Sequence, residues 1–253
     1  MSTLFISFPP GLLGSEALRI PLLANEAAYF ALAKPPGIAA VRDSLHVTRV
    51  ALLDAIRREI SAEKPQFLQQ GITAAEAVHW AEPEVSGIFL CAKTHEAKTQ
   101  LKNAMGALQF TFVYHFFAES RPGLPDEFTC DLPVARHRRE ARMLISHKTG
   151  KKAFTRFRRI EAFGTYGLWE SESPYDRPHQ VRLHAAESGL SIPGDTLYAP
   201  VPNASPSSLP GPLYDHIYLH HRRTFFPFGP GEQKELEMPY PKALQALLGV
   251  CRA

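Results

Sequence analysis

A polar loop that runs directly into a short apolar stretch constrains this chain more than any other part of its sequence. Residues 79–87 contain a proline and two acids, Glu82 and Glu84, and end at a glycine. Residues 88–92 are uninterruptedly apolar, which is the pattern of a buried strand. Loops fixed to a rigid strand often carry functional side chains, so this loop is the first candidate site. A short acidic loop can equally be solvated surface, and the loop alone identifies no chemistry.

The overall composition is typical of a soluble globular protein. The chain has 253 residues, of which 45% are hydrophobic and 21% charged, enough for one large domain or two small ones. Its three cysteines are an odd number and show no C-x-x-C spacing, so we expect neither a disulfide framework nor a zinc site. We expect a cytoplasmic location, because reduced cysteines fit that compartment. The first ten residues resemble no signal peptide, and we expect no membrane span.

Positive charge is concentrated between residues 136 and 159. This segment holds ten Lys and Arg residues against a single acid, whereas the whole chain has a formal net charge of only +3. Such a field favours a polyanion, because phosphate contacts release condensed counterions. The alternative is a solvated hairpin with charged faces. The cations interleave with Phe154 and Phe157, which indicates a strand with one basic face. The candidate polyanion-binding residues of this segment are Arg136, Arg138, Arg139, Lys151 and Lys152.

Hydrophobic periodicity predicts a mixture of helices and strands. Helices are expected where apolar residues recur at helical spacing, namely over residues 50–60, 94–108 and 241–249. Thr94 is a suitable N-cap for the second of these helices. A strand is expected over residues 109–118, which are dense in aromatic and β-branched residues. Further strands are expected over residues 29–33, 168–173 and 234–238. Because strands outnumber helices and are often adjacent, we predict the α+β class with a mostly antiparallel central sheet.

A second polar stretch follows about a hundred residues after the loop. Alternation from His179 to His184 predicts a strand, although the step into residues 185–188 leaves a helix open. The two histidines lie five residues apart without a third ligand, so we expect no metal site. Residues 199–212 contain five prolines, and we expect them to form a surface loop.

Five motifs, in the same order, resemble those of the RluA-type family of RNA pseudouridine synthases. They are Lys-Pro-Pro-Gly at residues 34–37, His-Trp-Ala-Glu-Pro-Glu-Val-Ser-Gly at 79–87, Phe-Val-Tyr-His-Phe at 112–116, Asp-Arg-Pro-His-Gln-Val-Arg-Leu-His at 176–184, and Gly-Asp-Thr-Leu-Tyr at 194–198. The resemblance extends from Tyr29 to the C-terminus. It implies the family's cofactor-free catalytic fold, with a central, mostly antiparallel mixed sheet, flanking helices and a cleft.

The resemblance also implies roles for individual residues. In the family, an Asp of the loop motif attacks the ribose of a flipped uridine, and uracil then turns and rejoins the ribose through carbon. Glu82 stands at that position, and Trp80 stands where the family has an arginine that holds the flipped-out RNA. Arg182 matches the basic partner of the catalytic carboxylate, and Tyr114 the tyrosine that stacks on the target base. Residues expected to support the cleft or contact RNA are Arg177, His179, Gln180 and Val181.

The resemblance therefore predicts an isomerase that converts uridine to pseudouridine in structured RNA. Glu82 is one methylene longer than the family's Asp, which moves the carboxylate by roughly 1–1.5 Å, and a misplacement of ~1 Å can cost ~100-fold in rate. A catalytically impaired RNA-binding protein that keeps the fold is the alternative. An unrelated hydrolase that uses Glu82 with Glu84 is a third hypothesis.

The predicted organisation is simple. Residues 1–28 are expected to be a lead-in without a separate RNA-binding domain, and residues 29–253 the catalytic domain. The expected partner is rRNA or tRNA. We expect no DNA partner, no membrane, no cofactor and no metal, and a monomeric protein.

Overall fold

The chain forms two compact units, and its backbone passes between them more than once. The computed structural model describes residues 4–42, 50–199 and 217–253, so the predicted proline-rich loop lies outside the described residues apart from Ala199. Unit 1 consists of Met1–Thr111 and Arg223–Met238. Unit 2 consists of Phe112–Arg222 and Pro239–Ala253.

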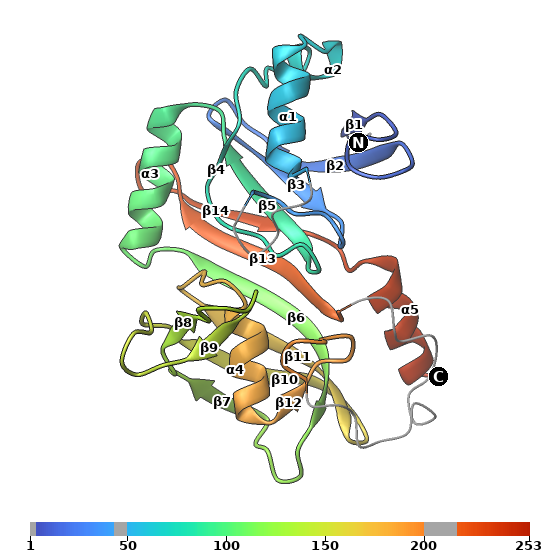
Figure 1. Cartoon of the computed structure of the whole chain (residues 1–253), viewed down its shortest axis with the longest axis vertical. Helices are drawn as coiled ribbons and strands as arrows, with labels where there is room; N and C mark the ends of the chain where they lie inside the picture. The colour runs from blue at the N-terminus through green and yellow to red at the C-terminus, as the bar shows by residue number, and fades with distance from the viewer. Residues whose placement is uncertain (1–3, 43–49, 200–216) are drawn as a thin grey trace. The chain divides into compact units, whose positions relative to one another are not determined.

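Unit 1 is built on antiparallel strands that pair in succession (Figure 1). They are β1 (Phe5–Phe8), β2 (Leu18–Asn25), β3 (Tyr29–Lys34) and β5 (Ser86–Ala92), and the two-residue β4 (Glu76–Ala77) also pairs with β5. Every residue of β3 and β5 is buried, which confirms the strand predictions for 29–33 and for the apolar run after the loop. The first two strands fall in the predicted lead-in.

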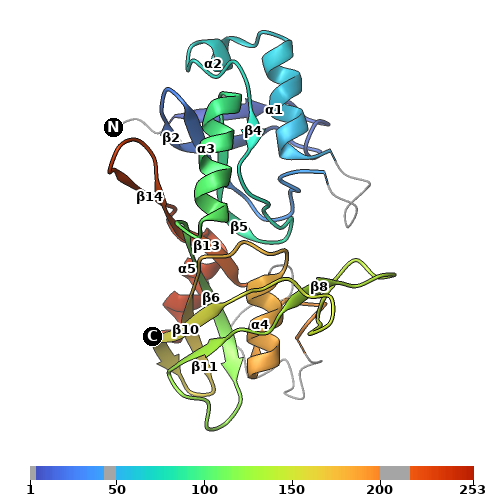
Figure 2. The ribbon, with the colours of Figure 1, turned by 90° about the vertical axis from the view of Figure 1, so that its left-hand side faces the viewer.

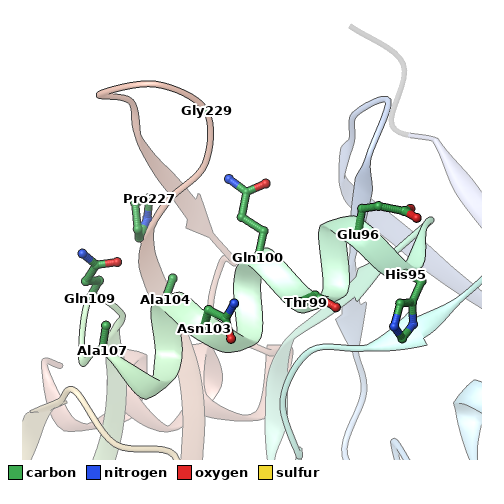
Figure 3. Close-up of a pocket in the computed structure, with 10 residues that line it drawn as sticks. All are labelled: His95, Glu96, Thr99, Gln100, Asn103, Ala104, Ala107, Gln109, Pro227 and Gly229. Atoms are coloured by element: carbon green, nitrogen blue, oxygen red, sulfur yellow. The ribbon is translucent and has the colours of Figure 1, made fainter.

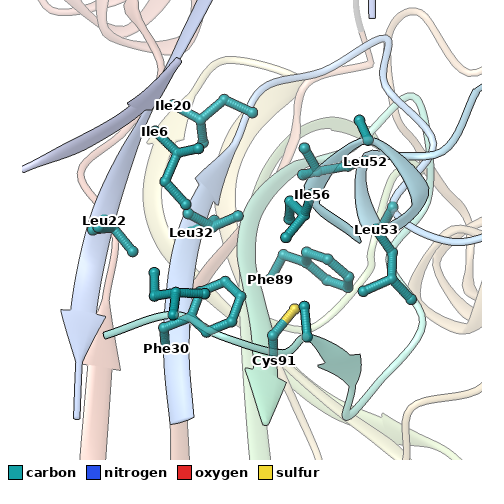
Figure 4. Close-up of a cluster of buried hydrophobic side chains, with 14 of the residues drawn as sticks. Ile6, Ile20, Leu22, Phe30, Leu32, Leu52, Leu53, Ile56, Phe89 and Cys91 are labelled. Carbon is teal, nitrogen blue, oxygen red and sulfur yellow. The ribbon is translucent and has the colours of Figure 1, made fainter. Parts of the chain in front are cut away.

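Three helices complete unit 1: α1 (Leu52–Ser61), α2 (Pro65–Leu68) and α3 (His95–Gly106). Leu52, Leu53 and Ile56 of α1 pack against apolar side chains of β1, β2, β3 and β5 to form a closed core (Figure 4). The predicted N-cap of α3 is confirmed, because the Thr94 hydroxyl accepts a hydrogen bond from the Ala97 amide at 3.1 Å.

Unit 2 is also built on an antiparallel sheet. It contains β6 (Thr111–Ser120, apart from its first residue), β11 (Tyr166–Ser173), β10 (Thr155–Phe163) and β7 (Glu127–Cys130), which pair in that order. The short β12 (Leu190–Ser191) pairs with the end of β6. The strand predictions over residues 109–118 and 168–173 are confirmed.

Two helices and a hairpin complete unit 2. The helices are α4 (Gln180–Ser188) and α5 (Lys242–Cys251). The hairpin pairs β8 (Val134–Arg136) with β9 (Met143–Ile145), and Figure 2 shows its turn reaching away from α4.

The predicted strand at residues 179–184 is wrong, because these residues begin α4. Six consecutive residues of α4, Gln180 to Ala185, are buried. A helix that is buried on every side shows no helical periodicity in its sequence. Gly189, with φ 89°, ends the helix in the left-handed conformation that glycine adopts readily.

The strand β13 (Leu219–Pro227) crosses from unit 2 into unit 1, where its second half pairs antiparallel with β14 (Gln233–Glu237). The predicted α+β class with a mostly antiparallel sheet is confirmed. No helix within the described ranges combines the length and the apolar character needed to cross a membrane.

Candidate active site

The loop of residues 79–87 is anchored at its first residue. His79 is buried, and its Nε2 accepts a hydrogen bond from the Leu90 amide of β5 at 3.2 Å. Its proton therefore lies on Nδ1, which donates to the Trp80 carbonyl at 3.1 Å. A neutral histidine thus fastens the start of the loop to the strand that follows it.

A buried lysine holds the middle of the same loop. Lys34, the last residue of β3, donates from Nζ to the carbonyls of Pro35, Ile38 and Pro83 at 3.0, 3.1 and 3.2 Å. The Gly37 amide donates to the same Pro83 carbonyl at 2.7 Å. Gly37 has φ 84°, a conformation that favours glycine, so the Lys-Pro-Pro-Gly turn is shaped to grip this carbonyl.

The electrostatics of unit 1 place two carboxylates beside that lysine. Burial lowers the pKa of Lys34 to about 7, and the charges of Glu84 and Glu82 oppose this shift. Both acids are half-buried, as is Trp80. Glu82 and Glu84 therefore flank Pro83, whose carbonyl accepts hydrogen bonds from both Lys34 and Gly37.

Arg182 lies in unit 2 and forms a buried ion pair with Asp195. Its Nε and Nη2 donate to the two carboxylate oxygens of Asp195 at 2.8 and 2.7 Å, and both side chains are almost fully buried. The same carboxylate accepts hydrogen bonds from the Leu197 and Tyr198 amides. Because Glu82 belongs to unit 1, its predicted pairing with Arg182 stays a prediction.

The other predicted residues of α4 are buried and hold the unit together. Gln180 Nε2 donates to the Phe154 carbonyl and to the hydroxyls of Thr155 and Ser173 at 2.9, 3.0 and 2.8 Å. His179 adopts φ 53° as the N-cap, and its Nδ1 is 2.8 Å from the Tyr198 hydroxyl. Val181 is 6% exposed. The half-buried Arg177 donates to the Lys152 carbonyl at 3.2 Å.

Tyr114 lies in the middle of β6 and is half-buried. Its ring stacks on the buried His221 ring of β13 within unit 2, with centroids 4.5 Å apart and planes at 17°. His221 thus braces one face of the Tyr114 ring.

The next residue of β6 points to the opposite face of the sheet, because side chains alternate along a strand. His115 lies 2.6 Å from the Tyr240 hydroxyl and 3.0 Å from Glu170. Hydrogen bonds from His115 and Arg158 lower the pKa of Glu170 to about 2, against the opposite effect of burial. This network fixes residues of the C-terminal segment to the sheet of unit 2.

The cations between residues 136 and 159 form two groups. Those of β10 are matched by acids: Arg156 by Glu127, Arg158 by Glu170, and Arg159 by Asp126. The predicted RNA-binding residues Arg136, Arg138, Arg139, Lys151 and Lys152 are exposed. The basic surface of unit 2 is therefore concentrated on the β8–β9 hairpin and on the segment that leads into β10.

Sequence reasoning assigned no functional role to three residues of these sites. The first two, Lys34 and Asp195, lie in motifs that carried the family resemblance. A charged residue that is buried in a turn needs a partner inside the protein, so both could have been predicted to hold another residue. His221 follows another histidine and gave no usable signal. Each of the three contacts one residue of a candidate site. Lys34 contacts Pro83 of the loop, Asp195 contacts Arg182, and His221 contacts Tyr114.

Unit 1 also has an open hollow of about 720 Å³ between α3 and the β13–β14 hairpin. Figure 3 shows neutral polar side chains along it, among them Gln100, Asn103 and Gln109. None of the predicted site residues lines it, so it is separate from the loop of residues 79–87. Over the described ranges, no three His, Cys, Asp or Glu side chains are grouped as metal ligands.

Comparisons with known proteins show the family of this chain. The sequence model of the family described as RNA pseudouridylate synthase matches residues 28–187. An uncharacterized RNA pseudouridine synthase of Chloroflexus aurantiacus is 27% identical over 187 residues, which cover 74% of this chain and 57% of that protein. Ribosomal large subunit pseudouridine synthase D of Zymomonas mobilis is 27% identical over 181 residues, which cover 70% and 56%. The chain thus matches little more than half the length of these relatives.

A solved structure shows the same fold. The human protein RNA Pseudouridylate Synthase Domain Containing 4 superposes with a TM-score of 0.72 at 16% identity, over 91% of this chain and 92% of that one. The family match covers well over half of the chain and includes the 79–87 loop, β6 and all of α4 except Ser188. This chain therefore belongs to the RNA pseudouridylate synthase family, as its resemblance to RluA-type enzymes predicted.

Proposed function

We propose that this chain isomerises uridine to pseudouridine in structured RNA. The observation that carries the proposal is the loop of residues 79–87, whose carbonyl at Pro83 is gripped by Lys34 and Gly37 while Glu82 stays half-buried. A carboxylate on a fixed backbone is what a nucleophile at this position needs. The proposed catalytic body is the stretch of residues 29–253.

In this proposal, Glu82 attacks the ribose carbon of the target nucleotide as the bond to the uracil nitrogen breaks. Uracil keeps the electron pair of that bond, turns, and forms a carbon–carbon bond to the ribose while Glu82 leaves. The proton lost from that uracil carbon is balanced by one gained at the released nitrogen. Atoms and electrons balance, and no cofactor enters the reaction.

The remaining proposed roles are those of the family residues that these side chains match in the motifs. Tyr114, braced by His221, stacks on the target uracil. Arg182 takes the role of the basic residue that partners the family's catalytic carboxylate, and Asp195 fixes its guanidinium. Trp80 fills the place of the flipped-out base. Ribosomal large subunit RNA is the first substrate to test, because a relative is named for it, and tRNA is the second.

The test is chemical mapping of pseudouridine in rRNA and tRNA that lack the modification, with wild type, Glu82→Gln and Glu82→Asp. We expect conversion by wild type, a loss of at least ~100-fold in Glu82→Gln, and retained activity in Glu82→Asp. The amide keeps the shape of Glu82 without its nucleophilic charge. Salt-sensitive RNA binding by a wild type that converts no uridine would sink the proposal and favour the RNA-binding alternative.

A further inference from the structure

The ring of Phe154 lies on the surface of unit 2, where it does not contribute to the hydrophobic core. Within residues 4–42, 50–199 and 217–253, it is the one Phe, Tyr or Trp in the exposed class, at 36%. Other aromatic rings of unit 2, such as Phe157 and Trp169, are fully buried. A lone exposed apolar residue is ordinary, so the surroundings of Phe154 decide whether it has a function.

Those surroundings are cationic. Ala153, Thr155 and Phe157 are buried, while the residues between them face solvent. Period-two alternation therefore places Phe154 on the same outward face as Lys152 and Arg156. Phe157, the other aromatic residue of this segment, packs inward.

The backbone under Phe154 is fixed on several sides. Lys151 exchanges two hydrogen bonds with Val134, at 2.9 and 3.0 Å. Arg177 donates to the Lys152 carbonyl, and Gln180 donates to the Phe154 carbonyl at 2.9 Å. The ring is thus presented on a rigid segment, which reduces the entropy lost when a ligand stacks on it.

The charges beside the ring differ in how they are compensated. Arg156 is engaged by Glu127 at 2.5 Å. Lys151 and Lys152, which precede Phe154 in the chain, are exposed. An exposed ring with Lys152 on the same face and Lys151 one residue further along the chain matches one ligand in particular: an unpaired nucleotide, which offers a π-face and a phosphate together.

We propose that Phe154 is a stacking platform for an unpaired RNA base, with Lys151 and Lys152 binding the adjacent phosphates. The inference rests on the proposed function in that the ligand is RNA. It adds a base-binding position outside the target-base site at Tyr114. This position favours RNA that offers an unpaired nucleotide in addition to the modified one.

The experiment measures binding of two fluorescently labelled RNAs at several salt concentrations: a stem-loop with a single-stranded loop, and a blunt duplex of the same stem. We expect Phe154→Leu to weaken stem-loop binding by about 5- to 150-fold without changing the salt slope, because stacking is lost while phosphate contacts remain. Phe154→Trp should bind the stem-loop at least as tightly as wild type. Lys152→Gln should reduce the salt slope for both RNAs by about one.

Ile160→Ala is the matched control, because Ile160 is an exposed apolar residue, at 39%, of β10, the strand that begins directly after Phe154. Ile160→Ala should bind like wild type. Equal stem-loop binding by Phe154→Leu and wild type would overturn this inference alone. An equal loss for stem-loop and duplex would also overturn it. Pseudouridine formation, followed separately, reports on the proposed function, and a wild type that binds neither RNA would overturn both.

Discussion

The loop of residues 79–87 and helix α4 are both candidate site elements, but different kinds of groups hold them in place. Backbone carbonyls do so in the loop, and side chains do so in the helix. In the loop, the carbonyls of Trp80 and Pro83 accept the hydrogen bonds that fix its path. In α4, the buried side chains of Gln180 and Arg182 make those contacts. Beyond the anchoring His79 side chain, the loop is thus fixed through its backbone, whereas the helix is fixed through its side chains.

This difference explains where the chain departs from the RluA-type motifs. Carbonyl groups are the same for every residue, so a loop held by them keeps its path when its side chains change. By the motif resemblance, Trp80 and Glu82 stand in place of the family's residues in such a loop. In α4, by contrast, Gln180 and Arg182 match the family pattern, because replacing either would leave buried polar partners unsatisfied.

The largest effect is expected in the helix. Arg182→Met leaves the Asp195 carboxylate buried without its ion partner, which should lower the free energy of unfolding by ~3–5 kcal/mol. Urea unfolding followed by circular dichroism measures it.

The double variant Arg182→Met/Asp195→Leu is the control, since it removes both charges and should recover much of the loss. A loss below ~1 kcal/mol in Arg182→Met would show that α4 is not held by this ion pair.

An intermediate effect is expected at the lysine that grips the loop. The folded-state pKa of Lys34 is lowered to about 7, so the unfolded chain holds this proton more tightly. The wild type should therefore gain stability as pH rises above about 7, by about 2 kcal/mol between pH 7 and pH 9. Lys34→Met should lack this gain.

The measurement is urea unfolding of both proteins across that pH range. Parallel pH profiles for wild type and Lys34→Met would contradict a neutralising buried lysine. Lys64→Met, which changes an exposed lysine of the same unit, serves as the control.

The smallest effect is expected from a loop side chain. Glu84→Gln leaves the Pro83 carbonyl contacts intact, so the free energy of unfolding should change by less than ~1 kcal/mol. Because the Glu84 charge raises the pKa of Lys34, its removal should shift the Lys34 titration to lower pH. Unfolding at pH 6 and pH 8 tests both points, and a loss as large as that of Arg182→Met would erase the contrast between loop and helix.

Local signals were enough to predict much of the fold. The apolar run of β5, the aromatic run of β6 and the Thr94 cap of α3 each carry their signal within a few residues, and all three predictions are confirmed. The basic face of β10 also follows from simple alternation, except that the sequence could not show which cations are matched by acids.

Other features depend on contacts that the sequence does not display. Helix α4 is buried on all sides, so its polar residues read as a strand. Strand β13 contains His220, His221, Arg222 and Arg223 in succession, a run without alternation. Asp195 was visible as a motif residue, but its pairing with Arg182 arises only when the two segments fold together.

The composition of the two units has a consequence for synthesis of the chain. Unit 1 includes Arg223–Met238, and unit 2 includes Pro239–Ala253. A ribosome that makes the protein from its N-terminus must therefore translate almost the whole chain before either unit has all its strands and helices. Long-range pairings of this kind slow folding. Nascent chains would expose Phe117, Tyr166 and Leu168, which later pack against Leu244, Leu247 and Leu248 of α5.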